Sequence, residues 1–451
     1  SDSQYAFFPS VSAGWRVSQE PFWKVPEEIF SNLKVRASYG SLGNGNIDPY
    51  SFQELFKIKQ SSLVLNGIRP QYTGQPAVIP LGLTWEKSTT LNLGLDFAFL
   101  SNRLQFSGDI YQRKTTDMFT VGMSLPAVFG TDVPKGNYAD LTTKGFELSV
   151  SWRDQFQLAS KPFNYEVRFT LADYQSTIDK YNNPEKKLGD DYYYEGMKVG
   201  EIWGYETEGF FTSQADIDSH AKQPYFYAGA TAGQWLPGDI KFKDLNGDGV
   251  IDYGNNTVDN PGDQKIIGNS EPRFIYGINL SGDWNNFFVS AFFQGVGKQD
   301  WWPGSEASYF WGMYNRPYND MPKSHLGNIW TEENPNTYFP RLRGYSSEEP
   351  YAELNLKQTR YLQNIAYIRM KNIQLGYTLP KSFISKLRMQ NAKVYVSGEN
   401  LWSWSPFYKY SKDLDVEAVR GSDRDLTEGT SGNGYSYPIL KSVSFGLSVT
   451  F

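Results

Sequence analysis

The chain has no cysteine and only two histidines, His220 and His325, among its 451 residues. Without cysteine it has no disulfide framework, no thiol nucleophile and no thiolate metal site. No run of about 18 apolar residues occurs, which excludes a transmembrane helix. The net charge of −6 argues against a nucleic acid as a partner.

What the chain does have is strict alternation of apolar and polar residues, seen most clearly in residues 441–451. Val443, Phe445, Leu447, Val449 and Phe451 alternate there with serine, glycine and threonine. This period of two predicts a β-strand with one apolar face. Such a strand could line the core of a soluble sheet, but a final aromatic residue is typical of the last strand of an outer-membrane barrel.

The same alternation recurs in residues 91–99, 104–110, 146–153, 165–172 and 274–281. These runs approach the 9–11 residues needed to cross a bilayer at a tilt, whereas strands of a β-sandwich usually have about 5–6. Their polar faces carry Glu147, Arg153, Glu166 and Arg168. Ionised groups are costly against lipid but tolerated in a water-filled lumen. The pattern therefore predicts an all-β fold, a transmembrane antiparallel β-barrel with long extracellular loops.

Eleven spanning strands are expected, with all of residues 1–451 belonging to one barrel domain. Their ranges are 5–17, 33–41, 83–100, 103–116, 144–153, 163–175, 272–281, 286–297, 363–379, 391–402 and 441–451. Short and long connections alternate, as in barrels with periplasmic turns and extracellular loops. The short ones are 101–103, 154–162, 282–285 and 380–390, the last expected to be a short amphipathic helix. The long ones are 42–82, 117–143, 176–271, 298–362 and 403–440.

The odd strand number indicates part of a longer chain, because bacterial single-chain barrels have even numbers of strands. No signal-peptide pattern opens the sequence, and the first expected strand would start at the extracellular side. We therefore expect the C-terminal part of a larger protein. The alternative is an overlooked strand within 176–271, for which residues 202–211 are the candidate.

Residues 244–252, DLNGDGVID, match the start of an EF-hand-type calcium loop. The expected oxygen donors are Asp244, Asn246, Asp248, the carbonyl of Val250, and Asp252. Position 12 is Asn255, so the closing ligand would come from Asp259 or Asp263. The motif predicts a structural divalent cation, with Ca²⁺ as the expected ion. The alternative is an Asx-rich turn without metal.

Aromatic residues concentrate in two segments of the expected loops. The first supplies the candidate substrate-binding residues Trp301, Trp302, Tyr309, Trp311 and Tyr314. The second contains Trp402, Trp404, Phe407, Tyr408 and Tyr410. Flat rings with polar edges stack well on sugars. The alternative is that they form interfacial girdles or pack the loops.

Catalytic signatures are poor. Both histidines lie in polar segments without a nearby G-x-S-x-G motif, and no phosphate-binding or dinucleotide-binding loop occurs. Acidic pairs at 206/208, 348/349 and 413/415 could imitate a glycosidase pair, although solvated loop acids are far commoner. We expect no enzyme. A barrel-borne hydrolase and a binding or adhesion barrel without transport stay as alternatives.

Several segments resemble SusC-like TonB-dependent transporters of Bacteroidota. Residues 83–96 resemble the family's L-x-W-E-x-x-x-x-x-N-x-G-L-D strand, and 237–244 and 267–274 resemble the segments around its Asp-Asn-Asp loop. Residues 367–377 and 394–401 resemble the penultimate strands. One mild departure is Ser270-Glu271, where the family usually has Asn-Pro.

The resemblance implies that this chain is the C-terminal half of a 22-stranded barrel in the Gram-negative outer membrane. The family's N-terminal plug, first barrel segment and TonB-contacting segment are expected to lie outside this chain. The implied partners are a SusD-like surface lipoprotein that lids the barrel, TonB, and outer-membrane lipid. The implied activity is import of oligosaccharides or peptides.

Overall fold

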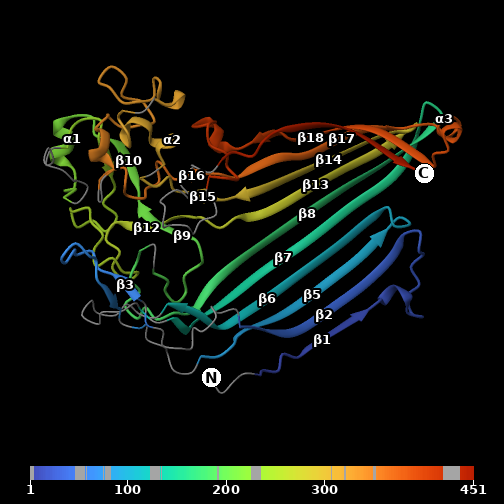
Figure 1. Cartoon of the computed structure of the whole chain (residues 1–451), viewed down its shortest axis with the longest axis horizontal. Helices are drawn as coiled ribbons and strands as arrows, with labels where there is room; N and C mark the ends of the chain where they lie inside the picture. Colours follow the sequence, from blue (N-terminus) through green and yellow to red (C-terminus); the bar gives the residue numbers. More distant parts are fainter. Residues whose placement is uncertain are drawn as a thin grey trace.

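The protein is described by a computed structural model, shown in Figure 1. The structure describes residues 5–45, 56, 58–74, 76, 83–121, 133, 135–189, 192–224, 235–305, 307–318, 321–348, 352–419 and 437–451. Each of the five expected long loops therefore lies partly outside the described residues, and Glu349 lies outside them.

The main element is an eleven-stranded antiparallel sheet in which each strand pairs with its neighbours in chain order. Its strands are β1 (Ser10–Trp15), β2 (Phe30–Asn44), β5 (Glu86–Phe99), β6 (Leu104–Val121), β7 (Lys135–Leu158), β8 (Lys161–Lys180), β13 (Arg273–Trp284), β14 (Phe287–Lys298), β17 (Tyr367–Thr378), β18 (Asn391–Trp404) and β19 (Ser442–Thr450). Each coincides with one of the eleven expected ranges. The sheet is open, because β1 and β19 are its two edges.

The register places apolar side chains opposite one another from strand to strand. Leu93 lies opposite Ala37 on one side and Ile110 on the other, and Ile110 lies opposite Phe146. These side chains share one face, since residues directly opposite in a sheet point the same way. Leu93 is 48% exposed and Ile110 is 60% exposed. One face of the sheet is thus apolar and uncovered, which a soluble sheet would bury.

The opposite face carries the polar residues. Arg36 donates from Nε to Asp96 Oδ2 and from Nη1 to Asp109 Oδ1, both at 2.8 Å. Asp109 lies opposite Glu147 on the next strand. Charged groups therefore gather on one side of the sheet and apolar groups on the other, as the alternation predicted.

The two ends of the sheet differ in their connections, as Figure 1 shows with turns at the right and loops at the left. Two-residue turns at 159–160 and 285–286 join strands at one end. Ala159, Ser160, Asn285 and Asn286 all have positive φ, as tight hairpin turns require. The expected helix within 380–390 is present as α3 (Lys381–Ile384) followed by the 3₁₀ turn η6 (Ser385–Leu387).

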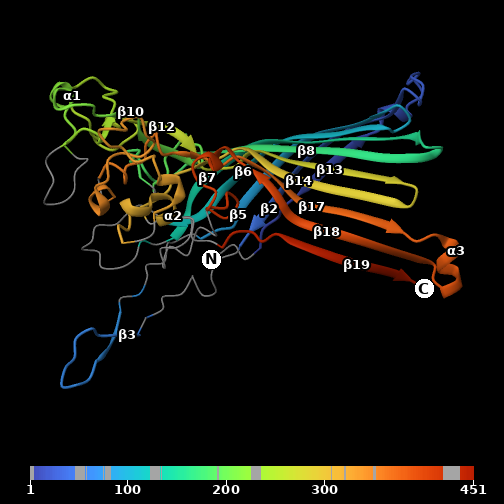
Figure 2. The ribbon, with the colours of Figure 1, turned by 90° about the horizontal axis from the view of Figure 1, so that it is seen from above.

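At the other end the long connections carry small sheets. β3 (Ile58–Gln60) pairs with β4 (Gln71–Thr73), and this hairpin extends away from the remaining loops in Figure 2. The other pairs are β9 (Glu201–Tyr205) with β12 (Gln264–Asn269), β10 (Thr207–Phe210) with β11 (Ile240–Phe242), and β15 (Asp300–Trp301) with β16 (Gln363–Asn364). Residues 202–211 thus form β9 and β10 in small loop sheets, so the idea of an overlooked spanning strand there is wrong.

The loops also contain short helical elements. These are α1 (Gln214–Ser219), α2 (Ser308–Trp311) and the 3₁₀ turns η3 (Gly312–Tyr314), η4 (Lys323–His325), η5 (Gly344–Ser347) and η7 (Pro406–Lys409), with η1 (Val17–Gln19) beside β1. Within the described ranges, no helix combines the length and apolarity needed to span a membrane.

Candidate functional site

Three of the long connections, 176–271, 298–362 and 403–440, fold together into one body at the loop end of the sheet, which we call the loop body. Its apolar core draws Phe242 from 176–271, Trp311 and Tyr314 from 298–362, and Phe407 from 403–440. All four side chains are at most 1% exposed. Phe310 contacts the ring of Phe407 across two of these connections. Burial of such large rings makes the loops a packed unit.

A buried ionic group ties two connections of the loop body together. Asp239 is fully buried and pairs with Arg341, whose Nε lies 2.6 Å from Asp239 Oδ1. Arg343 Nε donates to the same Oδ1 at 2.9 Å. Glu353 Oε2 accepts the backbone N–H of Ile240 at 2.9 Å. Burial, reinforced by the charge of Asp239 and opposed by Arg343, raises the pKa of Glu353.

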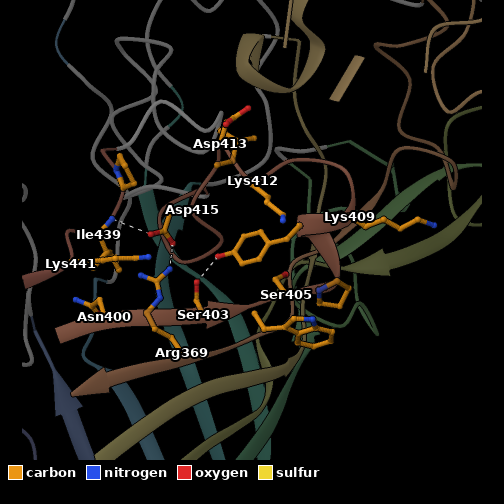
Figure 3. A pocket seen from close by; sticks show the side chains of 15 residues that line it. Arg369, Asn400, Ser403, Ser405, Lys409, Lys412, Asp413, Asp415, Ile439 and Lys441 are labelled. Atoms are coloured by element: carbon orange, nitrogen blue, oxygen red, sulfur yellow. Dashed lines mark hydrogen bonds and ion pairs between the residues drawn. The ribbon is translucent and has the colours of Figure 1, made fainter. Parts of the chain in front are cut away.

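A cavity of about 880 Å³ lies where β17 and β18 meet the 403–440 connection (Figure 3). This volume falls in the range of small-molecule sites. Residues of β18 and of the following turn form its floor, and residues 412–415 and 438–441 form its rim. The lining residues are Arg369, Asn400, Ser403, Trp404, Ser405, Pro406, Tyr408, Lys409, Lys412, Asp413, Leu414, Asp415, Pro438, Ile439 and Lys441.

The wall of this cavity is held by a cluster of ion pairs. Arg369 pairs through Nη2 with Asp415 Oδ1 at 2.6 Å and through Nε with Glu417 Oε1 at 2.8 Å. Lys371 pairs with the other oxygen of Glu417 at 2.5 Å. Asp415 Oδ2 also accepts the backbone N–H of Ile439 at 3.1 Å. The carboxylates of Asp415 and Glu417 are therefore neutralised by two cationic side chains of β17, Arg369 and Lys371.

Strand register explains why these groups meet. Arg369 lies directly opposite Ser403 on β18, so both side chains point to the polar face of the sheet. The Ser403 and Tyr408 hydroxyls lie 3.1 Å apart. The ladder between β14 and β17 shifts between Phe292 and Phe293, which makes Lys371 the extra residue of a β-bulge on β17. The result is a polar cavity able to bind and orient a ligand.

A second, shallower cavity of about 420 Å³ lies on the polar face along β6, β7, β8, β13 and β14. Asp109 and Glu147 contribute carboxylates, and Thr170 and Gln294 contribute neutral donors. It lies on the polar face of the sheet itself, so a solute moving along that face would meet these groups.

The expected cation loop is folded as a series of Asx turns. Asp244 accepts the N–H groups of Gly247 at 2.6 Å and Gly249 at 2.9 Å. Asp248 accepts the N–H of Val250 at 2.8 Å, and Asn246 accepts that of Asp248 at 2.9 Å. In the part of the chain that the structure describes, no three His, Cys, Asp or Glu side chains form a group that could hold a metal ion.

Of the two candidate closing ligands, Asp263 lies at this loop and is fully buried. Its carboxylate accepts the N–H of Leu245 at 2.7 Å and that of Asp252 at 2.9 Å. Burial raises the pKa of Asp263, against the effect of these N–H donors. The carboxylate oxygens predicted as cation ligands thus accept hydrogen bonds from the backbone of this loop.

The five aromatic candidates divide by burial. Trp301, Trp311 and Tyr314 belong to the core of the loop body. Trp302 packs against this core, and only Tyr309 is largely exposed, at 55%. Their positions match the loop-packing alternative for the three buried residues. Substrate contact stays a prediction, and in this conformation Tyr309 is the one candidate whose ring is widely open to a ligand.

Both histidines and two of the candidate acids are held by structural contacts. Nε2–H of His325 donates to the carbonyl of Phe310 at 2.9 Å, and His220 Nε2 lies 2.8 Å from the carbonyl oxygen of Phe242. Hydrogen bonds from Lys265 and Lys243 lower the pKa of Glu206. Asp415 of the 413/415 pair is bound to Arg369. These contacts give no support to the hydrolase alternative.

Sequence reasoning missed Arg369 and its carboxylate partners. Arg369 lies 46 positions before Asp415 in the chain, and the pair forms only when the 403–440 connection folds back over β17. The usable signal was an arginine within an otherwise alternating strand, because an ionised group at such a position needs a partner.

A family model described as TonB dependent receptor-like, beta-barrel, matches residues 1–401. TonB-dependent receptor P3 of Formosa agariphila is 28% identical over 472 residues, covering 100% of this chain and 42% of the relative. TonB-dependent receptor SusC of Bacteroides thetaiotaomicron is 24% identical over 476 residues, covering 100% of this chain and 40% of the relative.

Among solved structures, the RagAB peptide transporter superposes with a TM-score of 0.73 at 20% identity, covering 99% of this chain and 43% of that chain. The RagAB peptide importer in its open-open state gives a TM-score of 0.70 at 21% identity, with the same coverage. At this identity the likeness shows the fold. The chain spans about two fifths of the length of the relatives that it matches.

These findings agree with the sheet. An apolar face that is uncovered and continuous from β1 to β19 is what lipid contact requires, and the matched family consists of outer-membrane barrels. The expected barrel fold, the outer-membrane location and the likeness to SusC are confirmed. The chain belongs to the TonB dependent receptor-like β-barrel family.

Proposed function

We propose that the chain forms part of the wall and outer loops of a SusC-like importer and is not an enzyme. The observation that carries the proposal is the eleven-stranded sheet, apolar on one face and polar on the other, within a matched TonB-dependent family. The apolar face contacts lipid and the polar face lines the transport path. The loop end lies outside the cell and the turn end lies in the periplasm.

The open edges of the sheet support a larger barrel. Unpaired strand edges are unstable in a membrane, where every backbone N–H and C=O needs a partner. The relatives are more than twice as long as the aligned region. Polypeptide outside this chain would complete the wall between β1 and β19, and would supply the plug and the contact with TonB.

The loop body supports a lidded importer. Its packed core and buried Asp239 group give it a defined outer surface, which a partner protein needs for stable docking. We infer that a SusD-like lipoprotein covers this end and that the cargo is an oligosaccharide or a peptide. A relative named SusC and a fold match titled as a peptide transporter agree with this class of activity.

Native mass spectrometry of the full-length protein, purified from its own outer membrane in mild detergent, tests the proposal. We expect a complex with a surface lipoprotein, carrying a bound glycan or peptide. A cell lacking the protein should lose uptake of that cargo. A species without any partner, from cells whose uptake is unchanged by the deletion, would contradict the importer.

We also propose that residues 244–252 hold a structural divalent cation, with Ca²⁺ as the expected ion. Asp244, Asn246, Asp248, the carbonyl of Val250, Asp252 and Asp263 are the proposed ligands. Asp244→Ala with Asp248→Ala should lower the melting temperature of the loop body, and a chelator should lower it in the unmodified protein only. The matched control is Glu332→Ala with Glu333→Ala, which removes two carboxylates from an exposed turn. An unmodified protein whose melting temperature does not change with the chelator would rule the ion out.

A further inference from the structure

The cavity of Figure 3 has a surplus of positive charge. Its lining contains Arg369, Lys409, Lys412 and Lys441, against Asp413 and Asp415. Arg369 and Asp415 neutralise each other in their ion pair. The remaining charged residues of the lining are three lysines and one aspartate. This contrasts with the whole chain, whose net charge is −6.

Lys412 and Lys441 form no ion pair with the described carboxylates near the cavity. Salt bridges of Arg369 and Lys371 occupy the two nearby acids of the wall, Asp415 and Glu417. Among the residues described by the structure, no carboxylate comes within salt-bridge distance of Lys412 or Lys441. Both side chains are exposed at the rim, so both ammonium groups are available to a solute.

The directions of the side chains define a binding region. In Figure 3 Lys441 extends from the left toward Arg369 and Asp415, and Lys412 reaches down from the rim toward the interior of the cavity. Lys409 points away from the cavity on the right, and the Asp413 carboxylate points upward and away. The charges that face the interior are therefore the two ammonium groups and the neutralised Arg369 pair.

Neutral donors complete the region. Ser403 and Tyr408 share one hydrogen bond between their hydroxyls, which leaves one of the two protons free to be donated to a ligand. The Tyr408 ring adds a flat apolar surface. Ammonium and hydroxyl donors around an open, solvent-filled volume are suited to a carboxylate, because charge-assisted hydrogen bonds are roughly twice as strong as neutral ones.

We propose that this cavity is a subsite for the carboxylate groups of an anionic nutrient, held between Lys412 and Lys441. The inference rests on the proposed import function and narrows its cargo to acidic molecules. Such a carboxylate could belong to an oligosaccharide containing uronic acids or to an acidic peptide. The position at the loop end places the subsite where a solute would enter the polar face of the sheet.

Binding to the full-length protein, purified with its partner, tests this subsite. The probes are two matched pairs. The first is a galacturonic acid trisaccharide and its methyl ester, and the second is a tetrapeptide of four aspartates and a tetrapeptide of four asparagines. We expect the unmodified protein to prefer the acidic member of one pair, and the preference to weaken with salt. The pair that shows the preference identifies the source of the carboxylate.

The variant is Lys412→Gln with Lys441→Gln. Its preference for the acid should fall about tenfold, as expected for two solvent-exposed charge pairs, while binding of the neutral probe stays unchanged. The control is Lys323→Gln with Lys381→Gln, which removes the same charge from exposed positions outside the cavity and should keep the preference. Unchanged heat-dependent gel mobility verifies folding.

Two results would overturn the subsite: an unmodified protein that prefers neither acid, or a Lys412/Lys441 variant that keeps the full preference. Failure of import is seen separately, in uptake by whole cells. A protein that imports a neutral cargo yet shows no acid preference refutes only the subsite. A protein that shows the preference but supports no uptake refutes only the import function.

Discussion

Arg369 is the residue on which the cavity wall depends most. Its side chain is 4% exposed and contacts both Asp415 and Glu417. Removing one partner of a buried pair leaves an uncompensated charge, which costs far more than the pair contributes when intact. A single substitution can therefore open the wall without touching the core of the loop body.

The first prediction concerns Arg369→Met. The Asp415 carboxylate then loses its cation, and we expect the free energy of unfolding to fall by about 3–5 kcal/mol. Thermal unfolding of the full-length protein measures this loss. In Arg153→Met the pair with Glu166 is lost from a side chain that is 66% exposed, and the cost should stay below about 1 kcal/mol. Equal losses in the two variants would contradict a special role for Arg369.

The second prediction concerns pH. His325 is 1% exposed, and burial lowers its pKa, so the folded loop body holds it neutral. Unfolded chains bind a proton at histidine below about pH 6.5. The free energy of unfolding that neutral His325 contributes is therefore fully present above about pH 6.5. It is lost as the pH falls through the depressed pKa of the folded state.

Hydrogen exchange of the loop body at about pH 7 and about pH 5, corrected for intrinsic rates, measures this effect. We expect protection to decrease toward the lower pH in the unmodified protein and to change less in His325→Gln. The readout is the difference between the two proteins in how much protection changes from about pH 7 to about pH 5, because Gln also alters packing against Phe339. An equal change of protection in the two proteins would show that another group controls the loss of stability at low pH.

At the scale of elements, the strands were predictable because their two faces meet different solvents. The expected ranges located every strand of the main sheet, and Leu280 and Ser281 show the contrast between the faces. The ends of strands were harder: β7 and β8 extend beyond the expected 144–153 and 163–175. Beyond the membrane both faces meet water, so pairing continues there without an apolar signal.

The third prediction tests the faces with adjacent residues of β13. Leu280→Arg places a charge on the apolar face, which costs about 2–4 kcal/mol near the bilayer midplane. Ser281→Arg points to the polar face and lies opposite Glu166, so it should be tolerated. The folded fraction, read from heat-dependent gel mobility of the full-length protein, should fall only for Leu280→Arg. Comparable loss in Ser281→Arg would mean that the faces are assigned wrongly.

At the scale of the molecule, the protein has two parts with different sources of stability. The sheet depends on strand pairing and lipid, whereas the loop body depends on its own aromatic core. Trp311 is fully buried in that core, and the neighbouring Tyr309 is 55% exposed. Substitutions at these two positions allow the sheet and the loop body to be distinguished experimentally.

The fourth prediction is that Trp311→Ala opens the loop body while the sheet stays folded. Removing a fully buried tryptophan should cost about 3–5 kcal/mol. We expect rapid proteolysis within residues 298–362 and unchanged heat-dependent gel mobility. Tyr309→Ala should leave protease resistance intact. Loss of the folded sheet in Trp311→Ala would show that the two parts fold as one unit.

The sequence by itself determined the strands, their order and the chemistry of their faces. These are local properties, because period-two alternation and short turns are written in consecutive residues. It also located the DLNGDGVID loop, whose Asx turns are local. Only the tertiary structure decided that Trp301, Trp311 and Tyr314 pack inside the loop body, and that Arg369 meets Asp415. Those outcomes depend on contacts between segments far apart in the chain, whose meeting no local pattern specifies.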